Sequence, residues 1–371
     1  MLLAHLDRVP DHRRSQGKRY PLKFLLFFSI LAILSGATSY RDISRFIKKK
    51  RKSLNKAFGI NWEKTPSKSQ LRDVLCHIEI KDIESVFRKY TQALSELKGE
   101  VSKNRIGLDG KALRGSFDKA KGKKMLQLLG AFCAETELIV GHTDIAEKTN
   151  EIPTAQQLIK ELELPAGTLY TADALHCQKK TFEAVKEVKG ELVVQIKGNQ
   201  KILLQEVTEA CESLDPISTH IGTEKSRNRV ESRVVKVFDI QPRLKEDHCW
   251  KNYIGSVVLL IRYTQILDKK TSKWNVRSEA AYYLSSHIHC AEYVGKAIRE
   301  HWHTENRNHY VRDVSLDEDA SRIRTRPGVF ARLRSFAINI LRTNHIQNIK
   351  AALFENALDF DGLIAMEGLD C

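Results

Sequence analysis

The chain has 371 residues, of which 42% are hydrophobic, and its 61 Lys and Arg outnumber 46 Asp and Glu to give a formal net charge of +15 at pH 7. This length and apolar content exclude a globally disordered chain and allow about two or three domains. The positive charge favours a polyanionic partner, nucleic acid before others, although a merely basic globular protein is the plain alternative.

The cysteines and the one long apolar run indicate the cellular compartment of the protein. Seven Cys is an odd count, and no two of them stand at C-x-x-C spacing, which argues against a disulfide framework and a zinc knuckle. The first residues lack the pattern of a signal peptide. The apolar run 24–34 has only 11 residues, whereas a membrane-spanning helix needs about 20. We therefore expect a cytoplasmic, nucleoid-associated protein with no membrane partner.

Basic clusters mark the first part of the chain. Arg13 and Arg14 begin one cluster, and residues 48–52 are five consecutive cations. A solvated loop is the alternative for the second cluster taken alone. Together the clusters favour a helical, basic DNA-binding domain over residues 1–95.

Helical patterns accompany these clusters. We interpret the run 24–34 as a buried helix, and residues 40–47 show helical spacing. A third helix is expected after Pro66, with Ser67 or Ser69 as its N-cap.

The pattern changes after residue 100 to alternating strands and helices. The order is a mixed α/β arrangement with a hairpin start followed by crossovers, which is the order that a ribonuclease-H-like sheet requires. The expected elements are strands 106–109, 126–134 and 138–145, helix 153–162, strand 168–172, helix 178–188 and strand 192–196.

A second stretch interrupts this alternation. Residues 200–286 predict a β-rich insertion, with strands at 230–240, 253–263 and 280–284 and a turn at 268–271. Helices are expected again at 291–307 and 327–348. We place the catalytic domain at 100–350 and treat 351–371 as a C-terminal tail.

Two aspartates stand where predicted strands end. Asp109 follows Ile106-Gly107-Leu108, and Asp173 follows Tyr170-Thr171-Ala172. Taken singly, Asp109 fits a turn residue and Asp173 fits a helix N-cap. Sites in open α/β sheets gather at the carboxyl ends of strands, however, and the two carboxylates converge if these strands are neighbours.

A third carboxylate candidate lies on the helix 291–307. Val294, Ile298, Trp302 and Glu305 follow one helical stripe, so Glu305 is expected at the edge of the core-facing surface. A salt bridge to an Arg is the alternative explanation for a carboxylate there. The rival acidic residues are Glu300, Asp313, Asp317, Glu318 and Asp319.

Carboxylates within a strongly basic protein suit phosphodiester chemistry. Two Mg²⁺ ions about 3.5–4 Å apart can activate the attacking oxygen and stabilise the leaving oxygen, and such hard cations prefer oxygen ligands. Mn²⁺ is the expected substitute. A glycosidase would also use paired carboxylates but has no evident need for a charge of +15.

Three motif segments stand out around these carboxylates: Leu108-Asp109-Gly110-Lys111-Ala112-Leu113-Arg114-Gly115-Ser116, Asp173-Ala174-Leu175-His176-Cys177-Gln178 and His301-Trp302-His303-Thr304-Glu305-Asn306. They resemble motifs of a known family, the bacterial insertion-sequence DDE transposases of the subgroup that contains the H-repeat-associated proteins. Further matches lie at 147–153, 197–200, 318–322 and, near the start, 11–20, so the resemblance runs from about residue 5 to residue 350.

The resemblance implies a ribonuclease-H-like transposase domain with an Asp-Asp-Glu triad at Asp109, Asp173 and Glu305. The spacings are 173 − 109 = 64 and 305 − 173 = 132, and the β-rich insertion accounts for the longer one. The broader group often carries Tyr-x2-Arg-x3-Glu-x6-Lys. Ile298, His301, Glu305 and Arg312 stand at those positions here, so only the glutamate and a final cation agree.

Other residues near these motifs are candidates for supporting roles. Arg13, Arg14, Lys111, Arg114, Lys197 and Arg312 are predicted to contact DNA phosphates, with solvation as the alternative. His176, His301 and His309 could assist proton transfer or simply form hydrogen bonds, and Asn306 could support the site. Trp302 could stack on a base, although a core position is the commoner use of such a Trp. Arg229, Glu231 and Arg233 share one strand face, which could meet DNA or water.

These observations predict a transposase that binds double-stranded DNA at the element ends, cleaves it and joins the freed 3′ hydroxyl to target DNA. Bringing two ends together implies at least a homodimer. The alternatives are a metal-dependent nuclease without strand transfer and an inactive DNA-binding relic.

Overall fold

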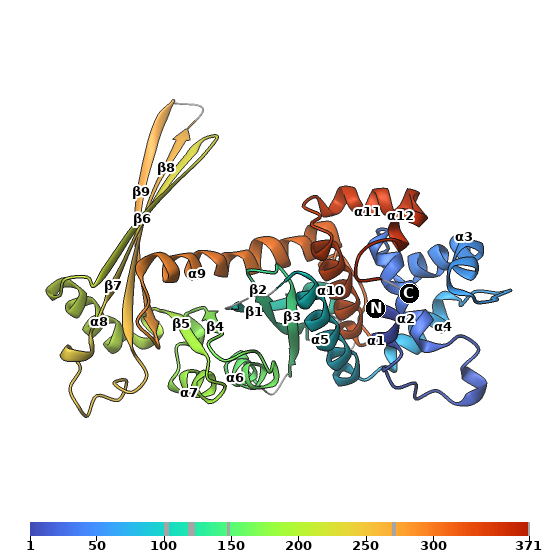
Figure 1. The fold of residues 1–371 in the computed structure, drawn as a ribbon, viewed down its shortest axis with the longest axis horizontal. Coiled ribbons are helices and arrows are strands. Elements are labelled where there is room, and N and C mark those ends of the chain that lie inside the picture. Colours follow the sequence, from blue (N-terminus) through green and yellow to red (C-terminus); the bar gives the residue numbers. More distant parts are fainter. Residues whose placement is uncertain (100–103, 118–121, 123, 147–148, 269–271, 370–371) are drawn as a thin grey trace. The chain divides into compact units, whose positions relative to one another are not determined.

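The computed structural model divides into two compact units, each described separately below. The first unit is built from residues 1–102, 110–151 and 305–371, and the second from 103–109 and 152–304. The structure describes all residues except 100–103, 118–121, 123, 147–148, 269–271 and 370–371 (Figure 1).

The first unit is mainly helical, with one hairpin. Strands β2 and β3 pair antiparallel, from Gln127 opposite Ile145 to Phe132 opposite Ile139. The elements are α1 (Leu2–Leu6), α2 (Leu22–Leu34), α3 (Tyr40–Phe58), α4 (Lys68–Cys76), α5 (Ile80–Leu97), β2 (Leu126–Cys133), β3 (Ile139–Ile145), α10 (Pro327–Thr343), α11 (Ile349–Leu358) and α12 (Phe360–Ile364).

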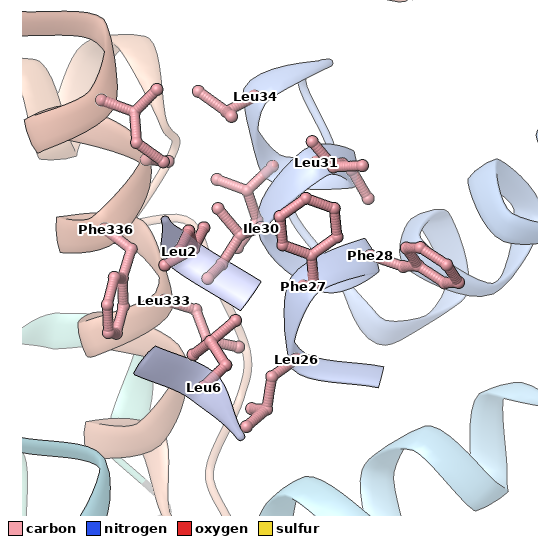
Figure 2. Close-up of a cluster of buried hydrophobic side chains, with 14 of the residues drawn as sticks. Leu2, Leu6, Leu26, Phe27, Phe28, Ile30, Leu31, Leu34, Leu333 and Phe336 are labelled. Carbon is pink, nitrogen blue, oxygen red and sulfur yellow. The ribbon is translucent and has the colours of Figure 1, made fainter. Parts of the chain in front are cut away.

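Helix α2 forms the centre of this unit. It is apolar on every side and is therefore buried on every side, as expected for the run 24–34. Figure 2 shows Phe27 and Ile30 of α2 in one cluster with Leu333 and Phe336 of α10. Among the described residues, no helix is both long and apolar enough to cross a membrane.

This shared core differs from the domain division expected from sequence. The predicted boundary near residue 95 separates segments that pack together, because α2 and α5 both contact α10. The described part of the expected tail, residues 351–369, is folded into the unit, since Leu353 and Leu363 belong to the same core. Its helices α11 and α12 pack on α2 and cover apolar surface that α2 would otherwise expose to water.

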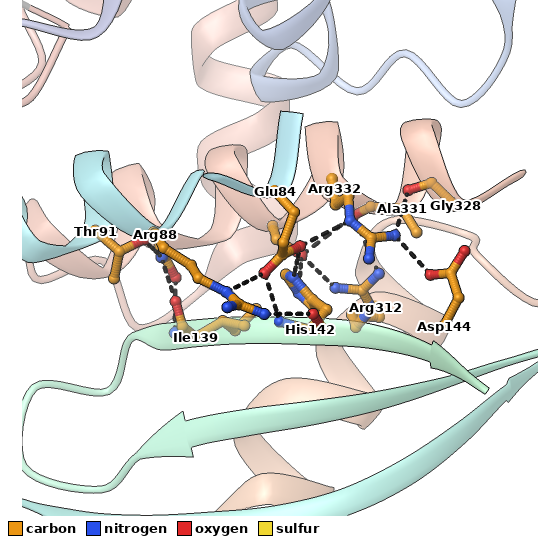
Figure 3. A network of polar contacts seen from close by, with 12 residues as sticks. Glu84, Arg88, Thr91, Ile139, His142, Asp144, Arg312, Gly328, Ala331 and Arg332 are labelled. Carbon is orange, nitrogen blue, oxygen red and sulfur yellow. Dashed lines mark hydrogen bonds and ion pairs between the residues drawn. The ribbon is translucent and has the colours of Figure 1, made fainter. Parts of the chain in front are cut away.

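A buried polar network joins α5, β3 and α10 within this unit (Figure 3). Glu84 accepts hydrogen bonds from Arg332 Nε at 2.7 Å, Arg88 Nε at 3.1 Å and the backbone N–H of His142 at 2.7 Å. Arg332 Nη1 also donates to Asp144 Oδ1 at 2.8 Å. Burial by itself raises the pKa of Glu84, but His142 and the two guanidinium groups hold this pKa well below its usual range. The carboxylate is thus charged and fully paired.

The second unit contains a mixed sheet. Its strands follow in the order β1-β4-β5-β9-β8-β7-β6, with β1, β4 and β5 parallel and the rest antiparallel. The elements are β1 (Arg105–Leu113), which continues into the first unit, α6 (Glu151–Glu161), β4 (Leu169–Ala172), α7 (Lys179–Glu187), β5 (Glu191–Ile196), α8 (Lys201–Ser213), β6 (Ser218–Ser226), β7 (Arg229–Phe238), β8 (Ser256–Asp268), β9 (Lys273–Ser285) and α9 (Ala291–His303).

The predicted mixed α/β architecture is confirmed. The ribonuclease-H-like order of three strands, helix, strand, helix and strand is present from β1 to β5. The β-rich insertion is also present, but it contains α8 and β6, which the sequence patterns did not predict. The expected turn at 268–271 lies largely outside the described residues. Strand β1 is longer than expected, because it runs through Asp109 and Gly110 to Leu113 instead of turning there.

Helix α9 ends earlier than the predicted 291–307. Its α-helical part stops at His303, and π-helical segments follow at Thr304–His309 and Val311–Ser315. Such wide turns change which side chains share a face and occur often at functional sites.

Candidate active site

The strands β1 and β4 bring Asp109 and Asp173 to the same edge of the sheet. The parallel register pairs Ile106 with Tyr170 and Gly107 with Thr171. Continued for two residues, it sets Asp109 beside Asp173, and adjacent strands lie about 4.8 Å apart. Side chains two residues apart share a face, so both carboxylates project on the face of Gly107 and Thr171.

The end of α9 covers this face. His301 Nδ1 lies 3.1 Å from Thr171 Oγ1, and Thr304 is buried against β1. A Cβ placed at Gly107 would lie 2.3 Å from Thr304 Oγ1, so a larger residue would force the Thr304 hydroxyl to move. Gly107 therefore gives the Thr304 side chain room against the strand that carries Asp109.

Two histidines lie beside Asp173. The Asp173 side chain is 56% exposed, caps the short turn that follows it by accepting from Leu175 N at 3.0 Å, and lies 4.0 Å from His176 Nε2. Burial lowers the pKa of His301 to about 4, although the nearby Asp173 carboxylate acts in the opposite direction. His301 is therefore neutral at pH 7 and suited to orienting a neighbour by hydrogen bonding.

The third parallel strand contributes a cation to the same edge. Lys197 is exposed directly after β5, the strand paired with β4. The loop after it is tied to the loop of Asp173, since Asn199 Nδ2 donates to the Ala174 carbonyl at 2.6 Å and Gln200 Nε2 to the Cys177 carbonyl at 2.9 Å. Lys197 therefore follows a strand end next to that of Asp173, and its predicted contact with DNA phosphate stays a prediction.

Glu305 follows Thr304 directly along the chain and is exposed. It makes no ion pair with any described residue, whereas four of its rivals have a basic partner. Arg105 Nε lies 2.5 Å from Glu300, Lys111 2.5 Å from Asp313, Arg312 2.7 Å from Glu318 and Arg114 3.6 Å from Asp319. Asp317 is exposed, with a left-handed backbone. Glu305 and Asp317 are thus the two candidates of this segment that are exposed and have no ion pair with a described residue.

Three of the predicted DNA-contacting cations have structural roles instead. Arg312 is 1% exposed and donates to Glu318 twice and to Ser335. Lys111 is 9% exposed and is paired with Asp313. Arg13 holds its own loop through Asp11 and two backbone carbonyls. The sequence shows the charges of these residues but not their buried partners, so the prediction of phosphate contact is corrected for all three.

Other predicted cations remain exposed. Arg14 is on the surface, and the Arg114 side chain is 77% exposed. The cations 48–52 lie inside α3, not in a loop. Helix α3 buries Ile43, Ile47 and Leu54 along one side. On the side away from this line it exposes Arg41, Arg45, Lys48, Lys49, Lys52 and Lys56, called here the α3 basic face.

Trp302 departs from its expected core position. Val294 and Ile298 are buried, but Trp302 is 53% exposed. The reason is that the covered line of α9 continues through His301 and Thr304 toward β1 and β4 and leaves Trp302 beside it. A Trp in solvent is available for stacking.

The remaining candidates lie on the π-helical segment after α9 and on β7. Asn306 is exposed and His309 is partly buried, both in the π-helical segment. Glu231 is buried and paired with Arg229 and Arg233, and the Arg229 side chain remains 47% exposed.

The arrangement can supply hard oxygen ligands but is not a complete metal centre. Among the described residues, no group of three His, Cys, Asp or Glu side chains is gathered closely enough to hold a metal ion. Asp109 and Asp173 do fit a divalent cation, because two carboxylates on adjacent strands provide the oxygens that Mg²⁺ prefers. Thr171, Thr304 and Gly107 were missed from sequence, where only their proximity to the motif residues could have indicated them.

Comparison with known proteins adds independent information. The family model "Transposase DDE domain" matches residues 100–341, and a model described as DDE_Tnp_1-associated matches residues 3–91. YncI of Escherichia coli O157:H7 is 30% identical over 350 residues, which is 92% of this chain and 87% of YncI. YbfL and the H repeat-associated YhhI, both of Escherichia coli K12, are each 29% identical over 358 residues, 93% of this chain and 91% of each relative.

Proposed function

The chain belongs to the transposase DDE domain family, and we propose that it cleaves DNA at the ends of an insertion sequence and joins the freed 3′ ends to target DNA. The observation that supports this proposal is the register of β1 and β4, which, continued two residues beyond Gly107 and Thr171, would set Asp109 beside Asp173. The end of α9 covers the same face, and Lys197 follows the next strand.

The reaction is proposed to depend on divalent metal ions, Mg²⁺ or Mn²⁺. Asp109 and Asp173 would hold them, and Glu305 is proposed as the third ligand because it directly follows Thr304. When bound, such ions activate an attacking oxygen and stabilise the leaving oxygen of a phosphodiester. Thr171 and the neutral His301 support Asp173, and Lys197 would neutralise a phosphate.

The central test is the product formed from DNA that carries the terminal inverted repeats of the element. We expect nicking at the repeat ends only when Mg²⁺ or Mn²⁺ is present, followed by covalent joining of the 3′ end to a second DNA, both visible on a sequencing gel. Cleavage without joined product would favour a nuclease, and binding without cleavage would favour a DNA-binding relic.

The α3 basic face is the proposed contact for duplex DNA in the first unit. Ser39 caps the N-terminus of the helix, and Gly59 ends it in a left-handed conformation. The cations therefore lie on one regular helix with both ends capped. Phosphate contacts release counterions, which makes affinity fall steeply with salt.

Neutralising two of these cations should therefore change the salt dependence. We expect Lys48→Gln with Lys52→Gln to weaken binding to all duplex sequences alike and to lower the slope of log affinity against log salt by about two, as measured by fluorescence anisotropy. The matched control is Lys180→Gln with Lys186→Gln on α7, which should leave the slope unchanged. Equal slopes for both pairs would contradict the assignment of α3.

A further inference from the structure

The outer half of β9 is an open edge of the sheet in the second unit. Strand β5 pairs only with the inner part of β9, from Tyr282 to Ser285, while β8 pairs with its whole length. Residues 273–280 are all exposed, and no described residue pairs with their outer edge (Figure 1). Exposed backbone donors and acceptors of this kind are a template for another strand.

Charged side chains follow one another across one face of the sheet up to this edge. Glu224 of β6 pairs with Arg233 of β7 at 3.5 Å, and Arg262 of β8, which lies opposite Arg233, pairs with Glu279 of β9. Arg277 is two residues from Glu279 and hence on the same face of β9. The open edge of β9 therefore carries one acidic side chain, Glu279, and one basic side chain, Arg277, on the same face.

We propose that this edge pairs with the same edge of a second copy of the chain, antiparallel and centred on Ser278. A twofold axis at Ser278 sets Arg277 opposite Glu279 of the other copy and, reciprocally, Glu279 opposite its Arg277. Val276 then faces Ala280 of the other copy, and Asn275 faces Ala281. The segment 275–281 fits within the part of β9 that β5 leaves open.

The residues of the edge explain why a second copy is favoured over DNA. The two signs alternate at Arg277 and Glu279, which suits a self-complementary partner and not a phosphate backbone. Val276 is 64% exposed, and pairing would cover it. A competing register, centred on Val276, would set Lys273 opposite Glu279. Ser278 is favoured because Arg binds a carboxylate through two parallel hydrogen bonds and Lys does not.

The symmetry also limits the assembly. Pairing about a twofold axis uses the same edge on both copies, so the contact closes at a dimer and does not continue into a filament. A seven-residue strand pair is a small interface, and we expect a dissociation constant on the order of micromolar.

Charge reversal tests this pairing without DNA or metal, so its outcome is separate from that of the proposed catalysis. Arg277→Glu and Glu279→Arg each create two like-charge pairs in the dimer, and each is expected to weaken self-association of the full chain by roughly tenfold or more in sedimentation equilibrium. The double swap, Arg277→Glu with Glu279→Arg, restores opposite charges and should restore the dimer. An equal mixture of the two single variants should also associate, because each supplies the charge that the other has lost.

The controls separate this result from other causes. Lys225→Glu makes the same charge change on β6 and should not alter the dissociation constant, and circular dichroism should show each variant folded. Failure of the mixture and of the double swap to associate would overturn the proposal. The proposal would also be overturned if Lys273→Glu weakened self-association and Arg277→Glu did not, because that result would indicate the register centred on Val276. If Arg277→Glu weakened DNA binding and left self-association unchanged, the edge would be a DNA contact.

Discussion

Asp173→Asn is expected to lower the rate of metal-dependent cleavage of element-end DNA by roughly 10³-fold or more, and Asp109→Asn by a similar factor. The substitution keeps the size of each side chain but removes the negative charge that a divalent ion requires. Gel assays of end cleavage, with protein in excess over DNA, would measure the rate.

Asn at position 173 also separates two explanations of this residue. The Asp173 side chain caps the turn after β4 by accepting from Leu175 N, and Asn is an equally good N-cap. If capping were its whole role, Asp173→Asn would be close to wild type in both stability and cleavage. The matched control is Asp215→Asn, an exposed aspartate of the same unit that should change neither. Wild-type cleavage by both Asp109→Asn and Asp173→Asn would reject the proposed site.

Of the proposed substitutions, Glu84→Gln is expected to lower the free energy of unfolding most, by about 3–5 kcal/mol. The reason is that Arg332 is 1% exposed and, of its two carboxylate partners among the described residues, would keep Asp144 alone. Urea denaturation followed by tryptophan fluorescence would measure the change. Glu246→Gln removes an ion pair of an acid that is 93% exposed and should have almost no effect.

The same network predicts the direction of the pH dependence. The pKa of Glu84 is lowered in the folded state, so its contribution to stability is present above its unfolded pKa and is lost as the pH falls. Burial lowers the pKa of His142 as well, so the unfolded chain takes up that proton first and stability again decreases on acidification below about pH 6.5. Glu84→Gln should therefore show a smaller acid-side loss than wild type. A steeper loss would contradict the assigned pairing.

Local patterns in the sequence were sufficient for most elements of the fold. The pattern after Pro66 predicted α4 with Ser67 or Ser69 as its N-cap, and the structure shows Ser67 as the cap, in a capping box with Gln70. Alternation predicted β2, β3, β4 and β5 within one or two residues at each end. Strand β6 was missed because Ser218–Ser226 is largely polar and exposed. Its sequence therefore lacks the alternation of apolar and polar residues that indicates a half-buried strand.

The candidate site was predictable in part. Asp173 was correctly placed at the end of a strand, whereas Asp109 lies inside β1, and the register of β1 and β4 is known only from the structure. The buried roles of Arg312 and Lys111 could not be predicted, because their partners Glu318 and Asp313 are defined only by tertiary packing. Periodicity also misplaced Trp302, since the covered side of α9 follows the strands beneath it and not an ideal stripe.

The first unit is assembled from three separate stretches of chain, and this has a consequence for its synthesis. Helix α2 is complete at Leu34, whereas α10, which shares its core, ends at Thr343. At about 5–20 residues per second, a ribosome needs on the order of tens of seconds to make the intervening chain. During that interval α1 and α3 can pack on α2, but the side of α2 that contacts α10 has no permanent cover. We expect a product that stops short of α10 to leave that apolar surface exposed and therefore to be prone to aggregation and degradation.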